Sequence, residues 1–215
     1  MLKDAALKLG VNMYGLIRIA FSVALLVLVH VILYVKKVKL KKSFYIISVV
    51  VTVVLIQILF LIPFENMVYS FPTAEKAYCY YYGNKEDDIV FSLEGRGSEM
   101  VIARKAGKDS MGIMSKESEK WKIGYATQLR VLADEMCGNA LVKVYKHVPS
   151  GDIYIRIMPI NISELKLEDN FGTEFVTCYS GYENSFPVYY GYVEEYSDGY
   201  ELSVNGEKYE IDIRK

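Results

Sequence analysis

Two apolar runs separated by a short basic segment dominate the N-terminal third of this 215-residue chain. The runs, 15–35 and 43–63, are each 21 residues long. At about 1.5 Å per residue such a run forms a helix about 31 Å long, close to the roughly 30 Å hydrocarbon core of a bilayer. Because a spanning helix bonds its backbone internally and carries few charges, the pattern predicts two transmembrane helices joined as a hairpin.

A cleaved signal peptide is the main alternative for the first run. Signal peptides have an apolar stretch of about 7–15 residues, followed by small residues at the cleavage site. Here the run is longer and ends in Tyr34-Val35-Lys36-Lys37. The sequence therefore favours a retained membrane helix.

The segment between the runs predicts the orientation of the hairpin. Short loops rich in Lys and Arg remain in the cytoplasm, whereas the tail 1–14 and the start of the first helix hold fewer basic residues than the loop. We therefore expect a multi-pass protein of the plasma membrane with both termini extracytoplasmic. The loop 36–42 carries this prediction through Lys36, Lys37, Lys39, Lys41 and Lys42.

Charge is divided unevenly along the chain. The net charge is −1, but eight of the 25 basic residues and one of the 26 acidic residues precede residue 64. The segment 64–215 therefore has 17 basic and 25 acidic residues, a net charge of −8. An acidic surface disfavours nucleic acid, whose phosphates bind Lys and Arg. The expected partners are the lipid bilayer and an unidentified membrane or cell-surface protein.

The segment 64–215 has the pattern of a β-rich domain with a short leading helix. Thr73 suits an N-cap, which predicts a helix over about 74–81, and Tyr69 and Phe71 lie where interfacial aromatic residues are expected. From residue 89 onward, period-two alternation predicts antiparallel strands. The expected fold is a membrane helical hairpin plus a mostly antiparallel all-β extracytoplasmic domain.

Two hairpins are the clearest of these strand predictions. Asn205-Gly206 favours a type I′ turn, within a three-stranded meander over 188–213. The second hairpin has its loop at 149–152, which pairs His147 with Tyr154 and predicts that the face bearing Ile155 is buried. The opposite face, with His147, is expected to be more accessible.

The layout also resembles a group of known proteins. Two spans with a basic loop, then Pro-Phe-Glu-Asn at 63–66 and Thr-Ala-Glu-Lys-Ala-Tyr-Cys-Tyr-Tyr-Tyr at 73–82, are similar to small two-span membrane proteins of Gram-positive bacteria. The resemblance covers mainly residues 43–82. It implies a location in a bacterial plasma membrane and brings no catalytic residues with it.

Candidate chemistry is sparse, and the sequence predicts no catalytic residue, metal or cofactor. Cys137 and His147 are about ten residues, or roughly 30 Å, apart on a predicted extended segment, which disfavours a Cys-His pair. The three cysteines match no metal-ligand spacing and allow at most one disulfide, so we expect buried small apolar side chains. The acidic turns 84–88 and 168–174 offer oxygen ligands for a hard cation, but solvated turns are the better interpretation.

Tyrosine is abundant beyond the apolar runs, because only Tyr14, Tyr34 and Tyr45 of the 19 tyrosines precede Pro63. Packing on sheet faces is the favoured interpretation, and a ligand or partner patch is the alternative. The candidate binding patch consists of Tyr179, Tyr182, Phe186, Tyr189, Tyr190 and Tyr192.

Polar residues inside the apolar runs are candidate functional residues by default. Counted from the basic loop, His30 lies at the depth of Ser48, and Ser22 at the depth of Gln57. Two interhelical hydrogen bonds would account for all four residues.

The sequence thus predicts a non-enzymatic binding module held at a membrane. The alternatives are an accessory subunit of a transporter or kinase that acts through its hairpin, and a cell-surface hydrolase.

Overall fold

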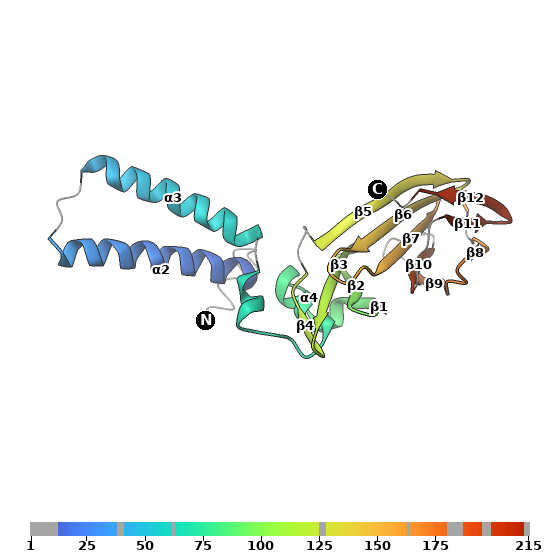
Figure 1. Cartoon of the computed structure of the whole chain (residues 1–215), viewed down its shortest axis with the longest axis horizontal. Coiled ribbons are helices and arrows are strands. Elements are labelled where there is room, and N and C mark those ends of the chain that lie inside the picture. Colours follow the sequence, from blue (N-terminus) through green and yellow to red (C-terminus); the bar gives the residue numbers. More distant parts are fainter. Residues whose placement is uncertain are drawn as a thin grey trace. The chain divides into compact units, whose positions relative to one another are not determined.

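The computed structural model separates the chain into two compact units, whose elements are labelled in Figure 1. One unit consists of Met1–Tyr69 and Cys79–Gly83, and the other of Ser70–Tyr78 and Asn84–Lys215. We call them the hairpin unit and the β unit. The structure describes residues 13–37, 41–61, 63–124, 128–162, 164–179, 187–194 and 199–212.

The hairpin unit contains two long apolar helices, α2 (Met13–Val35) and α3 (Lys42–Leu61), which run side by side. Both are long and apolar enough to cross a membrane. Most of their large apolar side chains are exposed, which is unfavourable for a helix surrounded by water. After Pro63 the chain forms the 3-10 helix η1 (Phe64–Met67), which ends where Val68 N bonds to Glu65 O at 3.0 Å.

The predicted leading helix is present as α4 (Ala74–Tyr82), and the boundary between the two units falls inside it. Thr73 caps its start, because Lys76 N donates to Thr73 Oγ1 at 3.3 Å. The first turns bury Ala74, Ala77 and Tyr78 in the β unit.

The prediction that Phe71 is an interfacial aromatic residue is wrong. Its side chain is buried, and its backbone forms an antiparallel bridge with Trp121 in the β unit. Tyr69, two residues earlier in the hairpin unit, is 56% exposed.

The β unit contains three antiparallel sheets. Sheet A is a four-stranded meander in the order β1-β2-β3-β4, and sheet B has the order β5-β6-β7-β10-β9. Sheet C has the order β12-β11-β8. The strands of sheet A are β1 (Ile89–Glu94), β2 (Ser98–Lys105), β3 (Lys108–Glu117) and β4 (Lys120–Lys122), preceded by the 3-10 helix η2 (Glu86–Asp88). Those of sheet B are β5 (Leu129–Cys137), β6 (Ala140–His147), β7 (Ile153–Pro159), β9 (Val176–Tyr179) and β10 (Pro187–Val193). Those of sheet C are β8 (Leu167–Asp169), β11 (Tyr200–Val204) and β12 (Glu207–Ile211).

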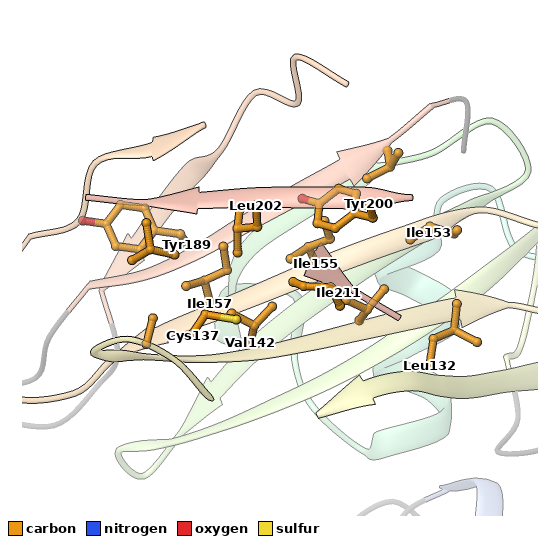
Figure 2. Close-up of a cluster of buried hydrophobic side chains, with 14 of the residues drawn as sticks. Leu132, Cys137, Val142, Ile153, Ile155, Ile157, Tyr189, Tyr200, Leu202 and Ile211 are labelled. Atoms are coloured by element: carbon orange, nitrogen blue, oxygen red, sulfur yellow. The ribbon is translucent and has the colours of Figure 1, made fainter. Parts of the chain in front are cut away.

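Sheet B is the middle layer, because each of its faces packs on another sheet. Its Ile155 face meets Tyr200 and Leu202 of sheet C, and Figure 2 shows these side chains pointing toward one another. Its Tyr154 face packs against Met100 and Ile102 of sheet A. Strands β7 and β10 are consequently buried on both faces.

The β6–β7 hairpin differs from its prediction in two respects, its register and the exposure of one of its faces. The pairing is shifted by two residues, so that Tyr154 lies opposite Tyr145 and Ile153 opposite Lys146. Because the shift is even, the predicted alternation of faces is preserved. The prediction that His147 lies on an accessible face is wrong: it is 1% exposed, since sheet A covers that side.

The predicted C-terminal meander is also only partly correct. The β11–β12 hairpin turns at Asn205-Gly206, both with positive φ as a type I′ turn requires. Strand β10, however, lies between β7 and β9 of sheet B and does not pair with β11.

Candidate functional site

Arg18 is the only charged residue of α2, and it is completely buried. It belongs to a run of buried or half-buried residues at every fourth position of the helix: Tyr14, Arg18, Ser22, Leu26 and His30. Its guanidinium forms a two-pronged ion pair with Glu65 on η1. Nη2 donates to Oε2 at 2.6 Å, and Nη1 donates to Oε1.

The Arg18 guanidinium also donates hydrogen bonds to two backbone carbonyls. Arg18 Nε donates to Leu59 O on α3 at 2.6 Å, and Nη1 donates to Tyr14 O at 3.2 Å. Bidentate geometry with additional hydrogen bonds is what offsets the cost of removing two charges from water. The pair therefore places no net charge at this end of the hairpin.

Aromatic side chains enclose the ion pair. The ring centroid of Tyr14 lies 3.2 Å from Arg18 Cζ, and that of Phe64 lies 5.0 Å away, both within cation–π range. Tyr80 donates its phenol hydrogen to Glu65 Oε1 at 3.1 Å. Burial, followed by the Glu65 charge, raises the pKa of Tyr80, so its hydroxyl stays a donor at neutral pH.

Sequence reasoning missed this ion pair. Neither Arg18 nor Glu65 is among the candidate residues that the sequence indicates. The available signal was the position of two opposite charges, one near the start of the first apolar run and one just past the end of the second. In a hairpin these two points come together.

The interhelical hydrogen bond predicted between His30 and Ser48 is absent. His30 Nδ1 lies 2.8 Å from Leu26 O in its own helix, and its ring stacks on Tyr45 at 5.7 Å. Ser48 Oγ donates to Tyr45 O at 2.8 Å. Each polar group thus finds a backbone partner one turn back, as Ser and Thr often do in helices.

The hydrogen bond predicted between Ser22 and Gln57 is absent too. Ser22 Oγ is buried and has no hydrogen-bond partner among the described residues. Gln57 is exposed, on the side of α3 away from α2. The depth of a residue along a helix does not fix its rotation about the helix axis.

The described lysines of the loop lie where the chain passes from α2 to α3. Lys36 and Lys37 follow α2, Lys41 precedes α3 and Lys42 begins it, and all four are exposed. Lys39 lies outside the described residues.

The candidate tyrosine patch is not a single surface. Tyr189 and Tyr190 are both buried and point to opposite faces of β10, toward sheet C and sheet A respectively. Tyr192 is half-buried, and of the four described members only Tyr179 is well exposed, at 67%. Tyr182 and Phe186 lie outside the described residues. The packing interpretation therefore holds for the buried members.

A buried polar network joins sheets A and B. His147 Nε2 lies 2.9 Å from Ser115 Oγ on β3, and Nδ1 lies 2.8 Å from Ser150 Oγ in the β6–β7 turn. Burial lowers the pKa of His147 against the opposing charge of Asp152. The imidazole is therefore neutral at pH 7 and connects two hydroxyls.

Asp152 is the other centre of this network. Its Oδ2 accepts from Ser98 Oγ at 2.6 Å and from Gly97 N at 2.9 Å. Its Oδ1 accepts from Tyr192 at 3.1 Å. Burial alone would raise the pKa of Asp152, but these bonds, that of Ser98 foremost, outweigh it and lower the pKa. The turn between β1 and β2 is thereby tied to the turn between β6 and β7.

The burial of this network determines whether its serine and histidine could act on a substrate. A Ser-His contact of 2.9 Å has the spacing of a nucleophile and its base. Here Ser115 and His147 are 3% and 1% exposed, and Nδ1 faces a serine where a catalytic triad has a carboxylate. In this arrangement the groups brace two sheets and are closed to a substrate.

Within the described residues, the other polar groups that the sequence offered as candidates have structural roles. Asp169 Oδ1 accepts from the backbone of Phe171 and Thr173, which fixes one acidic turn. Among these residues no group of three His, Cys, Asp or Glu could hold a metal ion. Cys79, Cys137 and Cys178, all of them described, form no disulfide; Cys137 is buried, which raises its pKa to about 11, while Cys79 and Cys178 are only half-buried.

Comparison of the chain with protein-family models, with curated proteins and with solved structures finds no significant match.

Proposed function

We propose that the chain is a two-span membrane protein whose hairpin anchors the β unit at the outer face of a bacterial plasma membrane. The β unit acts there as a non-enzymatic interaction module. The proposal depends on the buried Arg18–Glu65 ion pair. Arg18 is the only charged residue in the interior of the two helices, and the side chains that these helices expose are mostly apolar.

A bilayer is the environment that suits this pattern. An unpaired charge in a membrane helix is unfavourable by about 2.5–3.5 kcal/mol or more, so a charge that is retained there should be paired. Between Lys42 and Glu75 the only charged residue is Glu65. After it, Met67 and Val68 are 87% and 85% exposed, as expected of side chains that meet the interfacial layer of the lipid.

The exposed lysines of the loop support the orientation. Arg18 is neutralised by Glu65, so the uncompensated basic residues of the described hairpin are those next to the loop. The positive-inside rule then assigns the loop to the cytoplasm.

Exposed sheet edges support an interaction role for the β unit. Strands β5 and β9 are the two edges of sheet B, the positions at which a sheet can accept an added strand. Val131 and Met136 on β5 are each 52% exposed, and Val176 and Tyr179 on β9 are 37% and 67% exposed. Exposed apolar side chains on the edge strands of a sheet suit a protein partner.

Site-specific photo-crosslinking with the full chain in intact cells tests this role. A photoreactive residue replaces Val131 or Tyr179, and the matched control replaces Asn205 in the exposed turn of sheet C. We expect a discrete adduct from an edge position and none from the control. If both edge positions give no adduct, the β unit is not the interaction module.

An accessory subunit that acts through its hairpin is the second candidate function. The outward position of Gln57 favours it, because a polar side chain on an outer helix face suits contact with another membrane helix. In the same experiment, a discrete heterologous adduct from Val50 on α3 would support this candidate.

A further inference from the structure

Helix α3 has two different faces. The residues that pack toward α2 are half-buried: Phe44, Ser48, Thr52, Leu55, Ile56 and Leu59. At 3.6 residues per turn, Gln57 lies roughly 160–180° around the helix from Ser48, Leu55 and Leu59. The hairpin itself therefore cannot supply a partner for Gln57.

The outer face forms a regular stripe. Its members Ile46, Val50, Val53 and Leu61 are each more than half exposed, and Gln57 between them is exposed as well. From Ile46 to Gln57 the spacing is four, three and four, the alternation with which helices form left-handed coiled-coil contacts. The spacing of the stripe is compatible with packing against a second helix, and Gln57 distinguishes it from the other exposed rows of α3, which are apolar beyond the first turn of the helix.

The side-chain amide of Gln57 needs a hydrogen-bond partner on that second helix. Among the described residues none hydrogen-bonds to its amide. In hydrocarbon an unbonded amide is unfavourable, so a group that donates and accepts should face it. A primary amide is its own complement, because its NH2 is partly positive and its oxygen partly negative.

We propose that the outer stripe of α3 binds the same stripe of a second copy of this chain. Both copies enter the membrane in the same direction, so their α3 helices are parallel and a two-fold axis brings Gln57 opposite Gln57. Each amide then donates to and accepts from the other, while Val50 and Val53 pack beside them. The inference rests on the proposed membrane location.

Sedimentation equilibrium of the full chain in density-matched detergent micelles tests the dimer. The variants are wild type, Gln57→Leu and Thr52→Val. Thr52 is the matched control, because it lies on the same helix but its Oγ1 already donates to Ser48 O at 2.8 Å. Interhelical hydrogen bonds in membranes contribute about 0.6–2 kcal/mol, so Gln57→Leu should raise the dimer Kd about 3- to 30-fold. Thr52→Val should leave it unchanged.

Two results would overturn the inference. One is a wild-type protein that stays monomeric at every protein-to-detergent ratio, which would assign the stripe to a different partner. The other is a Gln57→Leu dimer as tight as wild type. Alkaline carbonate extraction of the membranes separates this failure from that of the proposed function. All three proteins should stay in the membrane pellet, whereas release of the wild type would contradict the anchoring itself.

Discussion

Asp152 ties two turns of the β unit together, so removing its charge tests whether the buried network stabilises the fold. Hydrogen bonds to a charged group contribute about 1.5–3 kcal/mol each, and a buried donor left without a partner costs about 1–3 kcal/mol. In Asp152→Asn the amide nitrogen must replace an oxygen that accepts from Ser98 and Gly97 or from Tyr192. We therefore expect the free energy of unfolding to fall by about 2–4 kcal/mol.

Urea unfolding followed by tryptophan fluorescence measures this loss. Trp121 is the single tryptophan of the chain and is 7% exposed in the β unit, so its emission reports on that unit. Asp134→Asn is the matched control, because Asp134 pairs with Lys143 at 2.8 Å on the surface. Such exposed pairs contribute about 0–1 kcal/mol. Equal losses in Asp152→Asn and Asp134→Asn would show that the buried network contributes no more than a surface ion pair.

Three further predictions concern the same unit. Because burial depresses the pKa of His147 below its usual 6.5, the folded protein binds fewer protons than the unfolded chain. The urea midpoint should therefore be constant above about pH 6.5 and fall as the pH drops below it, and His147→Gln should flatten that dependence. Tyr145→Ala and Ile155→Ala should each lower the free energy of unfolding by about 2–5 kcal/mol, since both faces of sheet B are buried; a negligible loss for Tyr145→Ala would contradict the layering. Gly97→Ala should lower it by about 1–3 kcal/mol in the same assay, because a Cβ there would lie 2.7 Å from Ser150 Cβ; an unchanged midpoint would show that the two turns are not in contact.

The elements predicted well are those that local physics determines. The apolar runs define the two long helices, Thr73 begins α4, and Asn205-Gly206 turns the last hairpin. Each depends on a few neighbouring residues. Their prediction therefore needs no knowledge of the rest of the fold.

The layering of the sheets could not be read from period-two alternation alone. Alternation assigns residues to two faces, but it does not show whether a second sheet covers the other face. The available signal was chemical, because Tyr145 and Tyr154 give the supposedly accessible face an aromatic character as well. Strands that are apolar on both faces are typical of a middle layer.

The two interhelical hydrogen bonds were mispredicted for a related reason. Depth along a hairpin follows from counting residues, and it brings Arg18 and Glu65 to the same end. Rotation about the helix axis depends on packing between the two helices. For this reason Gln57 faces outward and away from Ser22.

Labelling of intact cells with a membrane-impermeant amine reagent tests the central claim most directly. We expect Lys108 and Lys208, both exposed on the β unit, to be modified in intact cells. The exposed loop residues Lys36 and Lys41 should be modified only after the membrane is permeabilised. Mass spectrometry of the full chain before and after permeabilisation gives both readouts. Modification of Lys36 and Lys41 in intact cells, with Lys108 and Lys208 protected, would contradict the orientation and with it the display of the β unit at the outer surface.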